Sequence, residues 1–150
     1  MFDIFLTDKP VEDLDPGVEA VYGQIRLGDF QESFVADVVL WKPSQYLQHW
    51  RSAVRRIVEG EERSALITSF LEPSLSRYLV WWPLYRDGQN VRIQNQLRFF
   101  DQLRRPFSLE RYWDSVDQRR QISDNGEKIS EWIVPVEDMK AYLTHLKTQD

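Results

Sequence analysis

No cysteine occurs among the 150 residues. Its absence excludes disulfides, thiolate nucleophiles and cysteine metal ligands, and it fits a reducing compartment. The sequence also lacks a Walker-type phosphate loop, a dinucleotide fingerprint, a serine-hydrolase elbow and an HExxH zinc motif. The only histidines, His49 and His145, lie far apart in the sequence and could form an acid/base pair only by meeting in space. We therefore expect no catalytic residue, no metal site, no cofactor and no enzymatic activity.

Long hydrophobic segments are also missing. The longest apolar run, Tyr78 to Tyr85, is far shorter than the roughly 20 residues that span a bilayer. The first ten residues carry Asp3 and Asp8, where an export signal needs a basic start and an unbroken apolar stretch. The sequence predicts a cytoplasmic protein without a membrane partner. A hydrophobic content of 42% in 150 residues predicts one core, and hence one domain spanning residues 1–150.

The negative charge is concentrated at one end. Residues 1–40 hold nine Asp and Glu against Lys9 and Arg26, a balance of −7, so the remaining residues sum to +2. This asymmetry argues against nucleic acid as the partner and permits attraction to a basic protein, although solubility alone explains it equally well. The basic pairs Arg55-Arg56, Arg104-Arg105 and Arg119-Arg120 have acidic neighbours, so no nucleic-acid stripe is expected.

A β-hairpin is predicted from Tyr78 to Gln96. Asp87-Gly88 lies between two β-rich runs, a pattern typical of a two-residue turn, and it places Leu84 opposite Val91. One face of this hairpin is apolar and is expected in the core: Val80, Trp82, Leu84, Val91 and Ile93. The other face is expected to be exposed: Trp81, Tyr85, Asn90, Arg92, Gln94 and Gln96. Pro83 has no N–H to donate and therefore belongs at an edge or a bulge.

Further strands are predicted at Phe2 to Leu6, Val18 to Arg26, Phe30 to Trp41 and Ser64 to Leu71. Apolar residues spaced by three and four predict an amphipathic helix from Pro43 to Glu59, with Gly60 as its C-terminal cap. The later predictions are a turn at 73–76, a short helix capped by Ser108, a second hairpin joining Gln118–Ser123 to Lys128–Val134, and a last helix from Val136 through Leu146 that closes over the sheet. Turns too short for crossovers predict an α+β domain with a mainly antiparallel sheet.

Several short segments, taken in their order along the chain, resemble those of the immunity proteins of bacterial contact-dependent growth inhibition systems over roughly residues 20–140. They are Leu27 to Phe34, Trp41 with Tyr46 to Trp50, Ser64 to Ser69, Trp81 to Arg86 with Gln94 to Gln96, and Ile129 to Trp132. The resemblance implies a cytoplasmic inhibitor that binds the C-terminal toxin domain of a large exported protein, often a nuclease such as an RNase. The alternatives are a regulatory or structural interaction module, and an enzyme of unrecognised type that uses His49 or His145.

Two kinds of side chain are candidates for toxin binding. Acidic groups in predicted loops could mimic the phosphates that a nuclease binds: Asp8, Glu12, Asp13, Asp15, Asp29 and Glu32. Exposed aromatic residues are favoured anchors at interfaces, and the predicted hairpin offers Trp81 and Tyr85.

Overall fold

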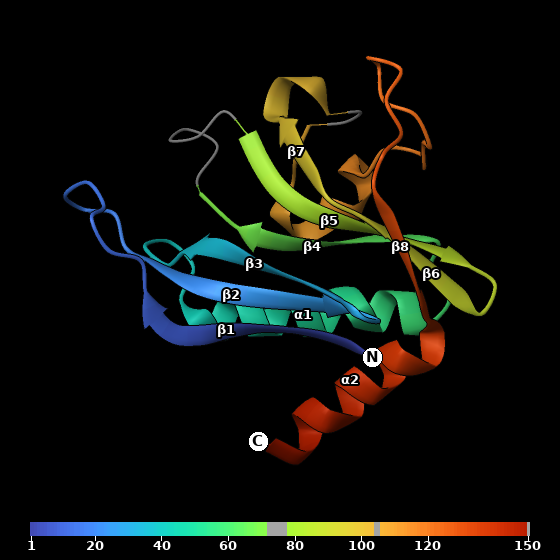
Figure 1. Cartoon of the computed structure of the whole chain (residues 1–150), viewed down its shortest axis with the longest axis horizontal. Coiled ribbons are helices and arrows are strands. Elements are labelled where there is room, and N and C mark those ends of the chain that lie inside the picture. The colour runs from blue at the N-terminus through green and yellow to red at the C-terminus, as the bar shows by residue number, and fades with distance from the viewer. Residues whose placement is uncertain (72–77, 104–105, 150) are drawn as a thin grey trace.

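The structure is a computed structural model that describes residues 1–71, 78–103 and 106–149, with side chains described through residue 145. It contains a three-stranded and a five-stranded antiparallel sheet, one long helix that lies behind the three-stranded sheet in the view of Figure 1, and a C-terminal helix. The elements are β1 (Phe2–Pro10), β2 (Ala20–Leu27), β3 (Phe30–Asp37), α1 (Pro43–Val58), β4 (Arg63–Ser69), β5 (Tyr78–Asp87), β6 (Asn90–Gln94), β7 (Gln96–Phe99), η1 (Phe100–Gln102), η2 (Leu109–Ser115), β8 (Glu131–Pro135) and α2 (Val136–Gln149). The predicted α+β class is confirmed, with two sheets in place of one.

The N-terminal sheet has the order β1-β2-β3, and its three strands are joined by a long loop and a tight turn. Gly28, with φ of 65°, begins the turn that joins β2 to β3. Gly23 in β2 lies under the Phe34 ring of β3, so closely that a Cβ atom there would overlap the ring. The third strand was predicted to extend to Trp41, but β3 ends at Asp37.

The central sheet has the order β4-β5-β6-β8, and β7 also pairs with β5. The predicted hairpin is present, but the predicted register is wrong by two residues: Leu84 lies opposite Ile93, and Arg86 lies opposite Val91. The turn residues are Gly88 and Gln89, and only Gly88 has a positive φ, as in a type II′ turn. The predicted pairs of Arg86 with Gln89, Leu84 with Val91, Trp82 with Ile93 and Trp81 with Gln94 are therefore absent.

Pro83 explains why the second half of this hairpin is divided into β6 and β7. The pairing of Trp81 with Gln96 continues the same register as that of Leu84 with Ile93. The ladder is interrupted between these pairs, where Pro83 lacks an N–H. The hairpin is therefore one bent ribbon from Tyr78 to Phe99.

The predicted second hairpin forms only in part. The turn at 124–126 is present, but the segments around it make one isolated bridge, between Ile122 and Lys128. The strand after the turn, β8, pairs instead with β6, where Trp132 lies opposite Ile93 and Val134 lies opposite Val91. Pairing of β8 with β6 is favoured over pairing with residues 118–123, because it adds the apolar side of β8 to the core, whereas residues 118–123 offer little apolar surface.

Helix α1 begins at Pro43 and is followed by Gly60 with φ of 104°, as predicted. Its side chains bond to the backbone of β4 and of the residue after it, at the edge of the sheet. Trp50 Nε1 donates to the Ile67 carbonyl (2.8 Å), and Tyr46 Oη accepts from the Phe70 N–H (2.9 Å). These bonds satisfy an edge that would otherwise be open to another strand.

The C-terminal helix α2 packs against α1, β1 and β8 rather than across one face of the central sheet. Tyr142 contacts Phe2 edge to face, with ring centroids 5.2 Å apart, and the N-terminal amine of Met1 pairs with Asp138 at 3.0 Å. The predicted turn at 73–76, the pair Arg104-Arg105 and the side chain of Leu146 lie outside the described residues. Among the described residues, no helix is long and apolar enough to cross a membrane.

Candidate functional site

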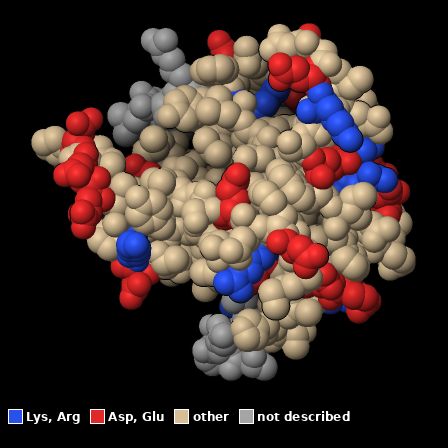
Figure 2. Space-filling model, in the orientation of Figure 1, with Lys and Arg blue, Asp and Glu red and all other residues tan. Residues whose placement is uncertain are grey.

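The six acidic residues predicted to bind the toxin fall into two groups at opposite ends of the N-terminal sheet. Asp8 lies in the outer half of β1, and Glu12, Asp13 and Asp15 lie in the loop from Val11 to Glu19, which we call the acidic loop. All four side chains are exposed. The loop projects from the body of the molecule in Figure 1, and Figure 2 shows Asp and Glu gathered on it.

Local backbone geometry shapes the acidic loop. Asp13 has a φ of 60°, an unusual value that Asp tolerates better than most residues, and the Asp15 carbonyl accepts a hydrogen bond from the Val18 N–H (3.1 Å). These turns present carboxylates to solvent at the tip of the β1–β2 connection.

The second acidic group, Asp29 and Glu32, lies at the β2–β3 turn. Eight residues of β2 separate the two ends of the sheet, a length of about 23 Å. Glu32 Oε2 accepts a hydrogen bond from Asn95 Nδ2 (3.4 Å), which connects the N-terminal sheet to the central sheet. The predicted acidic side chains are exposed, but they do not form one continuous surface.

The predicted exposure of Trp81 and Tyr85 is wrong. Trp81 is 1% exposed and Tyr85 is 6% exposed, because residues 112–120 cover this face of the central sheet. Tyr85 Oη donates to the Asp117 carbonyl (3.0 Å). Burial, with the nearby Asp117 charge as a second cause, raises the pKa of Tyr85 to about 12. Neither side chain can anchor a partner unless that cover moves.

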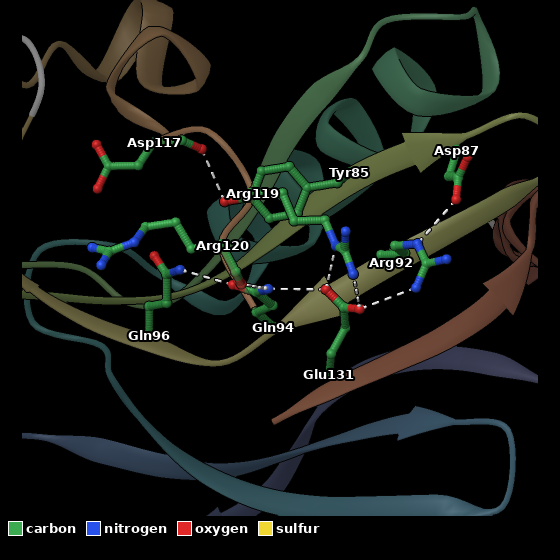
Figure 3. A network of polar contacts seen from close by, with 9 residues as sticks. All are labelled: Tyr85, Asp87, Arg92, Gln94, Gln96, Asp117, Arg119, Arg120 and Glu131. Carbon is green, nitrogen blue, oxygen red and sulfur yellow. Dashed lines mark hydrogen bonds and ion pairs between the residues drawn. The ribbon is translucent and has the colours of Figure 1, made fainter. Parts of the chain in front are cut away.

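A polar network that the sequence did not predict holds the cover in place (Figure 3). Glu131 of β8 accepts two hydrogen bonds of 2.7 Å from Arg119, in a bidentate pair, and one of 3.2 Å from Arg92. Gln94, which is fully buried although it was predicted to be exposed, donates to both Glu131 Oε2 (2.9 Å) and the Arg120 carbonyl (2.8 Å). These hydrogen bonds, that of Arg119 first, lower the pKa of Glu131 to about 2.

Sequence reasoning missed this network because its members are distant in the chain. Glu131 is 12 residues from Arg119, 37 from Gln94 and 39 from Arg92. The only local signal in the sequence is the Arg119-Arg120 pair, whose positive charge by itself suggests contact with an anion. Arg119 is instead neutralised by Glu131, and Arg120 pairs with Asp124 at 2.7 Å.

His49 is a buried packing residue. Its Nε2 accepts a hydrogen bond from the Ile67 N–H (2.8 Å), and its ring lies against those of Trp41 and Tyr112. Burial lowers the pKa of His49 to about 3, so the ring is neutral at physiological pH. In the part of the chain that the structure describes, no group of three or more His, Cys, Asp or Glu side chains could hold a metal ion.

Comparisons with known proteins place these features in a family. The family model described as the CdiI N-terminal domain matches residues 36–142. A curated relative, the immunity protein CdiI of Enterobacter cloacae subsp. cloacae, is 27% identical over 132 residues, covering 88% of this chain and 89% of the relative. A solved CdiA-CT/CdiI toxin and immunity complex from Enterobacter cloacae contains a chain that superposes with a TM-score of 0.85 at 25% identity, covering 99% of each chain. The matched region agrees with the resemblance found in the sequence, and the chain belongs to the family of CdiI immunity proteins.

Proposed function

We propose that this protein binds and neutralises the C-terminal toxin domain of a large exported protein and so protects the cytoplasm of its own cell. The observation that carries the proposal is the likeness, along 99% of both chains, to a protein solved as part of a toxin and immunity complex.

We further propose that the toxin is a nuclease, specifically an RNase. A nuclease holds phosphates in a cleft lined by Lys and Arg, and the acidic loop presents Glu12, Asp13 and Asp15 to solvent in one short segment. Carboxylates on a projecting loop can steer such a cleft toward the inhibitor and occupy the places of phosphates. Charges of this kind contribute chiefly to the rate of association.

Neutralisation by binding requires no catalytic group in the inhibitor. The buried, neutral His49 is unsuited to exchange protons with a bound substrate, because its Nε2 already accepts the Ile67 N–H. A folded variant with both His49→Gln and His145→Gln is therefore expected to protect cells as the wild type does. Loss of protection in that folded variant would favour the enzyme alternative.

The test uses the C-terminal toxin domain of the large exported protein that is proposed here as the partner. Cells that express the toxin domain are expected to grow only when this protein is co-expressed, and the purified proteins are expected to form a complex. Failure of the wild type both to bind and to protect would refute the immunity role.

The nuclease proposal is tested by charge. Neutralising the acidic loop with Glu12→Gln, Asp13→Asn and Asp15→Asn should slow association by about tenfold at low salt and leave dissociation nearly unchanged. Asn suits position 13 because it tolerates the positive φ there. The matched control neutralises three exposed carboxylates elsewhere, with Glu59→Gln, Glu110→Gln and Glu127→Gln. An association rate independent of salt, and equal in the two triple variants, would discard the acidic loop and with it the charge argument for a nuclease.

A further inference from the structure

The far end of the β5–β7 ribbon carries an exposed apolar face. Tyr78 pairs with Phe99 and Val80 with Leu97, so the four side chains lie on one face of two neighbouring strands, and we call them the ribbon patch. Tyr78 is 48% exposed, Phe99 43% and Leu97 53%, and Val80 is partly buried. The Tyr78 and Phe99 rings meet edge to face with centroids 6.4 Å apart. This end of the ribbon lies away from α1 and α2 in Figure 1.

The opposite face of the same ribbon is covered. Leu79 and Trp81 are each 1% exposed, and Arg98 is turned to this side, where it pairs with Asp117 at 2.6 Å. The one charged residue of β7 is thus on the covered face, while the apolar residues are on the open face. Within β7 this arrangement is the reverse of the alternation expected for a strand with one face in water. Solubility does not favour it, whereas apolar side chains gathered on a surface are typical of an interaction site.

One acidic side chain, that of Glu32, borders the ribbon patch. Asn95, two residues before Leu97 and on the same face, contacts the exposed Glu32 carboxylate of β3. Residues 78–81 and 95–97 contain no charged residue, and Figure 2 shows a largely uncharged surface over β5 and β7. A partner that fits this border has apolar side chains at the centre of its contact surface and Lys or Arg at its rim.

We propose that the ribbon patch is the anchoring surface for the toxin domain, a proposal that rests on the proposed function. Tyr78 and Phe99 take the role that Trp81 and Tyr85 cannot fill, since aromatic side chains dominate binding energy when a partner covers them. Glu32 meets a basic side chain at the rim. The acidic loop speeds the encounter, and the ribbon patch slows dissociation.

The test replaces apolar side chains of the ribbon patch by Thr, which is polar and keeps a high β propensity. The variant is Leu97→Thr with Phe99→Thr. The matched control is Ile133→Thr, because Ile133 is 53% exposed like Leu97 and belongs to the same sheet, but lies on the opposite face beside Arg92. Circular dichroism melts verify that both variants fold, and binding to the toxin domain is followed by stopped flow and by surface plasmon resonance.

The ribbon variant is expected to bind at least about 30-fold more weakly, almost entirely through faster dissociation, while the control stays within about twofold of the wild type. Wild-type affinity in the ribbon variant, or an equal loss in the control, would overturn the proposal. A wild type that forms a dimer in sedimentation, dissociated by the ribbon variant, would assign the patch to a second copy and would also overturn it. Because the wild type is measured in the same assay, failure of the immunity role itself is seen separately as absence of wild-type binding.

Discussion

The burial of His49 predicts that this protein loses stability in mildly acidic solution. The neutral ring accepts the Ile67 N–H at 2.8 Å and is packed between Trp41, at a centroid distance of 5.2 Å, and Tyr112, at 4.9 Å. A protonated imidazole cannot accept that hydrogen bond, and its charge would be buried. The folded protein therefore resists protonation until the pH approaches the lowered pKa of about 3.

The sign and the size of the effect follow from proton uptake. Between pH 6.5 and about 3, the unfolded chain binds a proton at His49 that the folded protein does not bind, so the free energy of unfolding falls as the pH falls. Lowering the pH from 7 to 5 should cost about 2 kcal/mol through His49 alone. Glu131 has a pKa of about 2 in the folded protein, so its contribution to the free energy of unfolding is lost only below its ordinary pKa of 4.5. Between pH 7 and 5 the change in stability therefore reports on His49 and not on this carboxylate.

Urea denaturation of the wild type and of His49→Gln at pH 7, 6 and 5 measures this effect. The variant is expected to be less stable at pH 7, because it loses ring packing, but to lose much less stability between pH 7 and 5. Gln can still accept the Ile67 N–H through its side-chain oxygen. The same pH slope in both proteins, or an imidazole that titrates near 6.5 by NMR in the folded wild type, would refute the reasoning.

Two further predictions concern packing and the polar network. Gly23→Ala should destabilise the protein by about 2 kcal/mol, because the new Cβ would overlap the Phe34 ring. A second change, Phe34→Leu, should recover part of this loss in thermal melts. Additive effects of the two changes would contradict this packing. Glu131→Gln should lower the free energy of unfolding by about 2 kcal/mol at neutral pH, because Arg119 loses its bidentate partner. The difference in stability from the wild type should shrink as the pH falls from 4.5 toward 2. A constant difference over that range would mean that the charge of Glu131 does not contribute to stability.

Local patterns decided much of the secondary structure. Helix α1 follows from the apolar stripe that includes Tyr46, Trp50 and Ile57, and from Gly60 at its end. The Gly28 turn follows in the same way, since a positive φ is a property of the residue and its neighbours. The family could also be identified from the sequence, because the short segments that resemble it lie on these same strands and on α1.

The register of the ribbon and the pairing of β8 required the tertiary structure. Asp87-Gly88 correctly located a tight turn, but the turn centred on Gly88 and Gln89 moved the pairing by two residues. The shift kept the same side chains on the same faces, because side chains alternate with a period of two. The pairing of β8 with β6 was decided by a gain of core burial between residues 37 to 45 positions apart in the sequence, which no local pattern reports.

The candidate surfaces divide in the same way. The sequence by itself determined that the N-terminal end is acidic and that Glu12, Asp13 and Asp15 lie in a loop, because charge and loop-forming residues are local properties. Only the tertiary structure decided which aromatic residues reach solvent. Trp81 and Tyr85 are buried by a segment about 30 residues later in the chain, while Tyr78 and Phe99 lie on the opposite face of the ribbon and stay exposed. Exposure depends on what the rest of the chain places on top of a strand, and the strand's own sequence does not contain that information.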